Sequence, residues 1–326
     1  MFNTSKIFSI SGEDEFEALA LEIFNFQYRN NLTYRQFCDL LHRNSENVDS
    51  LQKIPFLPID FFKSHEILSS KHPVEQIFTS SGTTGHKTSR HLVTNTQIYE
   101  KSFRKGFETT YGNVEEYVIL ALLPSYLDRN GSSLIYMVND LIQKSKNPHS
   151  GFYLNELSEL KEKLSFLDKQ GQKILLIGVS FALLDLAEIS SFSLKNTIIM
   201  ETGGMKGRRK EMIRAELHDR LKRAFSVEKI HSEYGMTELL SQAYSSGNGL
   251  FECPPWMKIF IRDPEDALEF LPAEKTGGIN VIDLANVNSC AFIATQDLGK
   301  INREGKTEIL GRFDHSDIRG CNLMVL

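Results

Sequence analysis

The sequence has few cysteines, no long apolar run and no leader-like start. Its four cysteines, Cys38, Cys253, Cys290 and Cys321, are widely spaced and form no C-x-x-C pair. This spacing argues against a zinc site or a disulfide framework and favours a reducing compartment. No apolar segment approaches the ~18 residues that a membrane-spanning helix needs, and the first residues lack the basic and apolar segments of a signal peptide. These absences predict a cytoplasmic protein without a membrane span.

A strong charge of either sign is also missing. The chain of 326 residues carries 37 lysines and arginines against 42 aspartates and glutamates, which gives a formal net charge of -5. Nucleic-acid-binding domains have a basic balance, so that class is not indicated. The nine histidines form no H-x-x-x-H pair. With 41% hydrophobic and 24% charged residues, the composition is that of a globular protein with one large domain or two.

The first 75 residues are predicted to be mainly helical. In "DEFEALALEIFNF" four apolar side chains share one helical face, namely Phe16, Leu19, Ile23 and Phe24. Thr33 is followed three residues later by Gln36, a capping-box pattern that predicts the start of a second helix. Residues 54–62, "IPFLPIDFF", contain two prolines and predict an extended connector.

From Gln76 the pattern changes to short apolar strands that alternate with helices. The predicted strands are "QIFTS", "RHLVT", "YVILALL", "KILLIGVS", "TIIME" and "VEKIHS". Asn95 is predicted to cap a helix that carries Phe103 and Phe107. Such strands predict an α/β fold with a mostly parallel sheet covered on both faces. After Gly247 the helices disappear, and "WMKIFIRD", "GGINVIDLA" and "SCAFIATQD" predict a smaller antiparallel β region.

One predicted helix, "KGRRKEMIRAELHDRLKRAF", has an apolar stripe beneath a basic face. The stripe consists of Ile213, Leu217, Leu221 and Phe225. The pattern is typical of a solvated surface helix of an α/β domain, and a docking face for a phosphate-bearing carrier is the alternative.

Residues 78–93, "FTSSGTTGHKTSRHLV", form a loop rich in glycine and hydroxyl groups. Gly82 and Gly85 permit a close backbone approach, so several N–H groups can converge on an anion. The neighbouring serine and threonine hydroxyls and Lys87 would add donors and a positive charge. The loop lacks the G-x-x-x-x-G-K-[ST] pattern of nucleotide hydrolases. It is therefore a phosphate cradle of another kind or, alternatively, a hydroxyl-rich surface turn.

The loop resembles the phosphate loop of the adenylate-forming superfamily, which includes acyl-CoA ligases, luciferases and peptide-synthetase adenylation domains. Four further motifs of that superfamily follow in order: "ETGGM" at 201–205, "HSEYGMTE" at 231–238, "ATQDLG" at 294–299 and "LGRFDHSDIRG" at 310–320. The resemblance implies the large N-terminal domain of these enzymes, with mostly parallel sheets flanked by helices and a smaller β subdomain. The divisions predicted on this basis are a helical part at 1–75, an adenylate-binding α/β core at 76–246, a β subdomain at 247–311 and a truncated hinge and tail at 312–326.

The resemblance also implies ATP as a substrate and Mg²⁺ as its metal. The nucleotide-binding residues that it assigns are Ser80, Ser81, Gly82, Thr83, Thr84, Gly85, Gly203, Gly204, Met205, Glu233, Tyr234, Gly235, Asp297 and Arg312. Lys87 would hold the β- and γ-phosphates, Thr237 would donate to the α-phosphate, and Glu238 would ligate Mg²⁺.

Two of these residues have specific roles in the resemblance. Tyr234 would stack against adenine, and Asp297 would accept from the ribose hydroxyls with Arg312 beside it. The alternatives without a ligand are an ordinary core tyrosine and an ordinary turn aspartate.

The sequence departs from the superfamily in two places. Most members continue for roughly a hundred further residues, which form a small mobile domain that supplies a catalytic lysine. Here the sequence stops at Leu326, so that domain and its lysine are expected to be absent. In the loop, His86 stands where proline is common and Thr88 where glycine is common.

A closer resemblance is to the acyl-protein synthetase family of the bacterial bioluminescence fatty-acid reductase complex. The matching segments are "IPFLPIDFFKSHEI", "SSGTTGHKTS" and "IRGC". The resemblance implies that the activated acyl group passes to a cysteine near the C-terminus, matched by Cys321, and then to an acyl reductase partner. Arg319 would lower the pKa of that thiol. The alternative is a buried tail cysteine that acts as a small hydrophobe.

The segments that resemble the acyl pocket predict an apolar acid, fatty or aryl. They place Phe181, Ser125 and Tyr126 on its walls. The predicted function is ATP-dependent activation of that acid and transfer to a thiol, which is Cys321, a partner carrier or coenzyme A. Two alternatives stay open: an acyl-CoA synthetase, similar to phenylacetate-CoA ligases, that needs a separate small domain, and a non-catalytic adenylate or acyl sensor.

Overall fold

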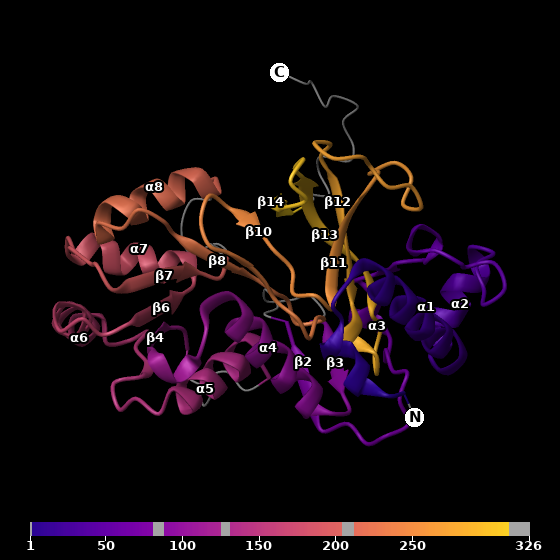
Figure 1. Ribbon diagram of the computed structural model, residues 1–326, viewed down its shortest axis with the longest axis horizontal. Helices are drawn as coiled ribbons and strands as arrows, with labels where there is room; N and C mark the ends of the chain where they lie inside the picture. Colours follow the sequence, from indigo (N-terminus) through magenta and orange to yellow (C-terminus); the bar gives the residue numbers. More distant parts are fainter. Residues whose placement is uncertain (1, 81–87, 125–130, 204–211, 313–326) are drawn as a thin grey trace.

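Two six-stranded sheets lie side by side in the computed structural model, which describes residues 2–80, 88–124, 131–203 and 212–312 (Figure 1). The first sheet has the order β5-β4-β6-β7-β8-β9. Its strands are β4 (Val118–Leu122), β5 (Gly151–Phe152), β6 (Ile174–Gly178), β7 (Thr197–Glu201), β8 (His231–Tyr234) and β9 (Ala243–Ser245). β5, β4, β6, β7 and β8 pair in parallel, and only β9 joins antiparallel.

Helices cover both faces of this sheet, as its continuous apolar strands predict. They are α4 (Thr96–Tyr111), α5 (Ser133–Ser145), α6 (Leu157–Lys169), α7 (Ser180–Ile189) and α8 (Arg214–Phe225). Because successive strand side chains alternate between faces, Ile119 and Ala121 of β4 share a core with α4 and α5, whereas Val118 and Leu120 share one with α6, α7 and α8 (Figure 1).

The second sheet is antiparallel along the path β10-β14-β13-β12-β11. Its strands are β10 (Leu250–Phe251), β11 (Met257–Arg262), β12 (Gly277–Asp283), β13 (Phe292–Ile301) and β14 (Thr307–Arg312). The short β1 (Leu57–Pro58) pairs in parallel with β13. A separate antiparallel pair, β2 (Gln76–Thr79) and β3 (Arg90–Val93), flanks residues 80–89.

The N-terminal helices pack on the second sheet, so they extend its core. They are α1 (Glu13–Asn30), α2 (Leu32–Leu40) and the single turn α3 (Phe61–Ser64). Gln27 Nε2 donates to the carbonyl oxygens of Asn286 (3.1 Å) and Val287 (2.8 Å), and the Tyr34 ring stacks on Phe292 with centroids 6.0 Å apart. No helix in the described part of the chain is both long and apolar enough to span a bilayer.

Most of the predicted elements are confirmed, and three details are wrong. The second helix starts at Leu32, with Asn31 rather than Thr33 as its cap: Asn31 Oδ1 accepts from the Tyr34 N–H at 3.0 Å. The connector at 54–62 is extended through β1, as predicted, but its last two residues begin α3. α8 begins at Arg214, so Ile213 precedes the helix and is 73% exposed.

Candidate active site

The predicted nucleotide-binding segments converge where the parallel sheet faces the second sheet. Gly203 follows the end of β7, and residues 235–238 follow the end of β8, its neighbour in the sheet. Ligands of open α/β sheets bind at such carboxyl ends of strands. The Tyr234 hydroxyl donates to Asp297 Oδ2 on β13 at 2.8 Å. This hydrogen bond therefore links the end of the parallel sheet to the antiparallel sheet.

Asp297 and Arg312 are cross-strand partners on β13 and β14. Arg312 Nε lies 3.5 Å from Asp297 Oδ1, and the arginine side chain is 70% exposed. Burial raises the pKa of Asp297, whereas donation from Tyr234 and the charge of Arg312 oppose that rise. The Asp297 carboxylate is thus partly covered, with the Tyr234 hydroxyl as a hydrogen-bond donor and the Arg312 guanidinium as a nearby cation.

The base of the predicted phosphate loop is closed by two serines. The Ser80 N–H donates to the Ser89 carbonyl (3.2 Å), and the Ser89 N–H donates to Ser80 Oγ (3.0 Å). The Ser89 side chain hydrogen bonds to the carboxyl group of Glu238, whose pKa is raised by burial. Glu238, predicted as the metal ligand, therefore lies at the base of the loop.

The backbone after β8 is held by three buried polar side chains. His91 Nδ1 lies 2.8 Å from the Thr237 carbonyl oxygen, and Asn286 Nδ2 donates to the Glu238 carbonyl at 2.7 Å. Asp283 accepts from the Leu240 N–H at 2.7 Å. Burial lowers the pKa of His91 to about 4, although its hydrogen bonds to Thr237 and Asn286 favour the protonated ring.

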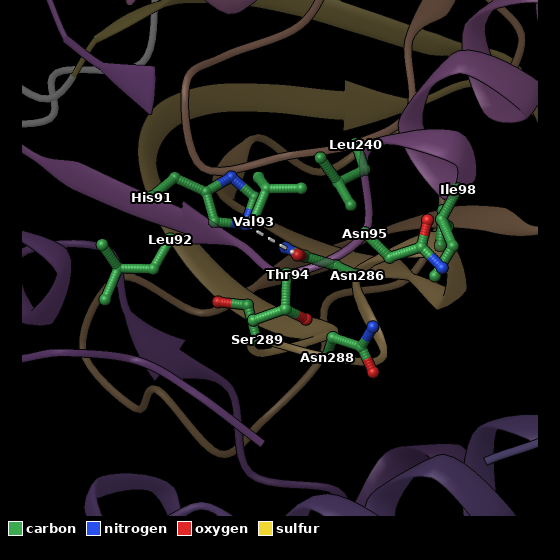
Figure 2. A pocket seen from close by; sticks show the side chains of 11 residues that line it. His91, Leu92, Val93, Thr94, Asn95, Ile98, Leu240, Asn286, Asn288 and Ser289 are labelled. Carbon is green, nitrogen blue, oxygen red and sulfur yellow. Dashed lines mark hydrogen bonds between the residues drawn. The ribbon is translucent and has the colours of Figure 1, made fainter. Parts of the chain in front are cut away.

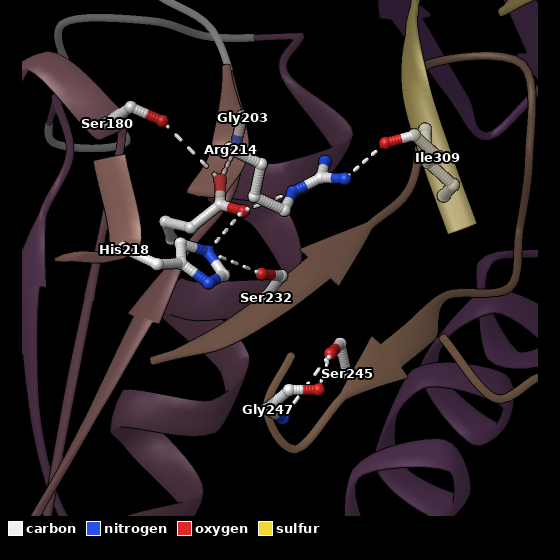
Figure 3. A network of polar contacts seen from close by, with 9 residues as sticks. Ser180, Gly203, Arg214, His218, Ser232, Ser245, Gly247 and Ile309 are labelled. Atoms are coloured by element: carbon white, nitrogen blue, oxygen red, sulfur yellow. Dashed lines mark hydrogen bonds and ion pairs between the residues drawn. The ribbon is translucent and has the colours of Figure 1, made fainter. Parts of the chain in front are cut away.

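A buried carboxylate at the end of β7 gathers donors from several elements (Figure 3). Glu201 Oε2 accepts from the Gly203 N–H at 2.7 Å and from Ser180 Oγ at 3.4 Å, and Arg214 Nε donates to Oε1 at 3.2 Å. His218 Nε2 lies 3.6 Å from the same oxygen. Glu201 thereby fixes the turn at Gly203, where φ is +67°, to α7 and α8.

Arg214 continues this network to the other sheet. Its guanidinium donates to the Ile309 carbonyl on β14 (Figure 3). It also lies 5.1 Å from the Phe251 ring centroid on β10. The pair Glu201–Arg214 is therefore a second link between the two sheets, beside the one made by Tyr234 and Asp297.

Glu201 and Glu233 are two buried carboxyl groups whose pKa values are shifted in opposite directions. Burial alone would raise the pKa of Glu201, but donation from His218 and the charge of Arg214 lower it to about 2. Burial, together with the charge of Glu201, raises the pKa of Glu233 to about 8. The Glu233 carboxyl fills the space beside Gly235, where an added Cβ would lie 2.5 Å from Oε1. Only glycine fits at 235 without displacing Glu233.

Replacing Glu233 with glutamine is expected to flatten the pH dependence of stability. Between its ordinary value of 4.5 and about 8, the folded chain keeps this proton and the unfolded chain releases it, so wild-type stability falls as pH rises. From pH 5 to pH 8 that loss is about 3 kcal/mol from this one group. Urea unfolding at both pH values measures the difference between the two proteins. The exposed Glu304→Gln serves as control, and parallel wild-type and Glu233→Gln curves would contradict the assignment.

The remaining predicted residues have mixed outcomes. Phe181, the second residue of α7, is partly buried and packs on the core shared by α6, α7 and α8. A set of predicted residues lies outside the described part of the chain: Ser81, Gly82, Thr83, Thr84, Gly85, Lys87, Ser125, Tyr126, Gly204, Met205 and Cys321. A cavity of about 660 Å³ beside residues 10–16 and 251–260 is lined by none of the predicted site residues, so it is separate from this site.

A metal bound only by protein side chains is not indicated in the described ranges, where no group of three or more His, Cys, Asp or Glu residues could hold one. Mg²⁺ bound to a nucleotide needs fewer protein ligands. Phosphate and water oxygens supply most of its ligands, and the protein supplies one or two carboxylates. The single buried carboxylate of Glu238, at the base of the loop, fits that donor set.

Sequence reasoning missed His91, Asn286 and Glu201. The only local signal was Glu201, a charged residue at the end of the apolar strand "TIIME". A charge buried in such a strand needs partners, which here come from residues 180, 203, 214 and 218.

The profile of the family described as "Acyl-protein synthetase, LuxE" matches residues 4–116 and 141–326. The chain is 25% identical over 332 residues to the long-chain-fatty-acid–luciferin-component ligase of Vibrio harveyi, which covers 92% of this chain and 84% of that protein. The ligase of the same name from Photorhabdus luminescens is 35% identical over 71 residues, covering 22% of this chain and 60% of that protein.

The fold is similar to that of solved acyl-CoA ligases. The open conformation of 2-hydroxyisobutyryl-CoA ligase in complex with 2-HIB-AMP and CoA gives a TM-score of 0.68 at 13% identity, over 93% of this chain and 70% of that one. ATP-bound MatB from Rhodopseudomonas palustris gives 0.56 at 16% identity, over 74% of this chain and 49% of that one. The chain thus spans about half the length of MatB and of an ATP-bound MatB chimera. The predicted fold class is confirmed.

Proposed function

Because the chain belongs to the acyl-protein synthetase family, we propose that it joins a carboxylic acid to ATP as an acyl-adenylate and transfers the acyl group to a thiol. The observation that carries this proposal is the arrangement around the end of β8. Glu238 lies at the base of the phosphate loop, and Tyr234 reaches Asp297 across the two sheets. One segment of five residues therefore contacts both the region proposed for phosphate and the region proposed for ribose.

The first half-reaction needs the negative charge of the triphosphate to be offset while a carboxylate oxygen attacks the α-phosphorus and pyrophosphate leaves. Loop residues 80–87, with Lys87, are proposed to hold the β- and γ-phosphates through backbone N–H groups, hydroxyls and one cation. Thr237 would donate to the α-phosphate. Glu238 would hold Mg²⁺, which supplies further neutralisation of phosphate charge when bound.

The nucleoside would be held by the two-sheet junction. Asp297 has free acceptor capacity beyond its contacts with Tyr234 and Arg312, so it can accept from ribose hydroxyls. The Tyr234 ring and the turn at Gly203 would form the walls of the adenine site. In the second half-reaction a thiolate attacks the acyl carbon and AMP leaves with the carboxylate oxygen.

The acid is proposed to be apolar, and the relatives' names favour a long-chain fatty acid. Phe181 at the start of α7 offers an apolar wall, and Gly203 adds no side chain. Proposed acceptors are Cys321, a partner carrier or reductase, and coenzyme A. The cytoplasmic location stays a prediction.

The test is acid-dependent exchange of radiolabelled pyrophosphate into ATP, with a panel of fatty and aryl acids of graded length. Exchange that requires both Mg²⁺ and one class of acid is expected. If the protein binds ATP but catalyses no pyrophosphate exchange with any acid of the panel, it is a nucleotide sensor, and the proposed function is contradicted.

Asp297→Asn is expected to raise the KM for ATP by about tenfold or more, because hydrogen bonds to a charged acceptor contribute roughly 1.5–3 kcal/mol. Tyr234→Phe keeps the ring and removes only the hydroxyl that donates to Asp297, so a change of a few-fold is expected. KM values from pyrophosphate exchange, with melting curves for each variant, separate the two effects. If both variants raise the KM for ATP equally, Asp297 acts by binding the Tyr234 hydroxyl and not by accepting from ribose.

A further inference from the structure

His91 lies on β3, directly after the proposed phosphate loop, and its side chain is fully buried. Its ring meets the Phe62 ring edge-on at a centroid distance of 5.8 Å. Phe62 belongs to α3, so the histidine is wedged between the N-terminal part of the chain and the segment after β8. A fully enclosed imidazole at this place is positioned to hold other groups rather than to meet a ligand.

The ring holds one backbone carbonyl of the proposed catalytic segment and lies against Asn286, the side chain that holds the next carbonyl. His91 Nδ1 donates to the Thr237 carbonyl at 2.8 Å, since a carbonyl can only accept. His91 Nε2 lies 2.9 Å from Asn286 Oδ1 (Figure 2). Asn286 Nδ2 donates to the Glu238 carbonyl at 2.7 Å. The backbone carbonyls of Thr237 and Glu238 therefore both depend on this pair of side chains.

The residue before β3 also reaches the Glu238 side chain. Ser89, two residues before His91, hydrogen bonds to the Glu238 carboxyl and closes the loop base with Ser80. The segment 89–91 thus contacts the loop base, the proposed metal ligand and the carbonyl before it. A change in this segment would displace all three together.

We propose that His91 is a positioning residue that, with Asn286, holds the Thr237–Glu238 backbone so that the Glu238 carboxylate is already in place for Mg²⁺ on the ATP phosphates. The inference rests on the proposed function and adds to it a residue that touches neither nucleotide nor metal. Without the His91 donor the Thr237 carbonyl loses the side chain that holds it, so the segment shifts or loosens. The carboxylate must then be ordered when the metal binds, which weakens binding.

The experiment measures binding of radiolabelled ATP by equilibrium dialysis, without acid, at increasing Mg²⁺ and in EDTA. His91→Leu is expected to raise the Mg²⁺ concentration for half-maximal binding by about tenfold, and to change binding in EDTA by less than about twofold. His91→Asn is the rescue, because its amide nitrogen can take the place of Nδ1. Its Mg²⁺ midpoint is expected within about threefold of wild type.

His72→Leu, at an exposed position, is the matched control and should leave both measurements unchanged. Asn286→Ala removes the donor to the Glu238 carbonyl without changing His91, and it should also raise the Mg²⁺ midpoint. This variant tests the inference if His91→Leu does not fold.

The inference is overturned if folded His91→Leu follows the wild-type Mg²⁺ titration, or if it weakens ATP binding equally with and without the metal. In that case wild-type binding of Mg²⁺–ATP leaves the proposed function standing. A wild type that shows no Mg²⁺-dependent ATP binding would overturn both.

Discussion

Replacing Glu238 with glutamine is expected to slow acid-dependent pyrophosphate exchange by a factor on the order of 10² or more. Glutamine keeps the size of the side chain and can still accept from Ser89, but it loses the negative charge that Mg²⁺ prefers as a ligand. The loss should fall mainly on kcat, because the developing charge on the leaving pyrophosphate is greatest in the transition state.

The control for this variant is Glu304→Gln, which alters an exposed glutamate in the turn between β13 and β14. Thermal melting should show both variants folded, since burial already raises the pKa of Glu238 and neutralising a buried carboxyl removes a desolvation cost. A folded Glu238→Gln protein with exchange within about threefold of wild type would remove Glu238 from the metal site.

Cys321→Ser is expected to abolish a covalent acyl adduct while leaving pyrophosphate exchange intact. A thiolate is a far better nucleophile toward an acyl-adenylate than a serine hydroxyl. The three other cysteines are poor candidates: burial raises the pKa of Cys38 and of Cys253 to about 12, and raises that of Cys290 further. A thiol with so high a pKa is protonated at neutral pH and is a poor nucleophile.

Intact-protein mass spectrometry after incubation with ATP, Mg²⁺ and the preferred acid measures the adduct. Wild type and Cys253→Ser, which alters the least buried of the three described cysteines, should carry one hydroxylamine-sensitive acyl group. An adduct that persists in Cys321→Ser would place the acyl group on another residue. No adduct on wild type, with exchange still present, would point to an external thiol.

Much of the fold could be predicted because the deciding signals are local. The apolar strands β4, β6 and β7 are short and continuous, and the residues after Gly247 lack helical periodicity. The family resemblance was confirmed as well. Two of the departures involve distant contacts: Asn31 caps α2 while its amide nitrogen donates to the Ser289 carbonyl, 258 residues away, and β1 exists only because β13 pairs with it. Such contacts leave no trace in a short window of sequence.

In the site, too, residues within local motifs could be predicted, and residues brought together by distant contacts could not. Motif residues such as Tyr234, Glu238 and Asp297 could be named because their spacing resembles a known pattern. The residues that hold them, His91 and Asn286, could not, since they are 195 positions apart and meet only in the folded chain. Arg214 lies in the segment for which a basic surface face was predicted, whereas it hydrogen bonds to the buried Glu201 and to the Ile309 carbonyl of the second sheet.

The most direct test of acid activation through an acyl-adenylate follows the oxygen atoms. The preferred acid, with isotopically labelled carboxylate oxygens, is incubated with enzyme, ATP, Mg²⁺ and a thiol acceptor, and the AMP is analysed by mass spectrometry. AMP that carries one labelled oxygen is the predicted result, because a carboxylate oxygen attacks the α-phosphorus and leaves with AMP. Unlabelled AMP, or label found in inorganic phosphate beside ADP, would contradict it.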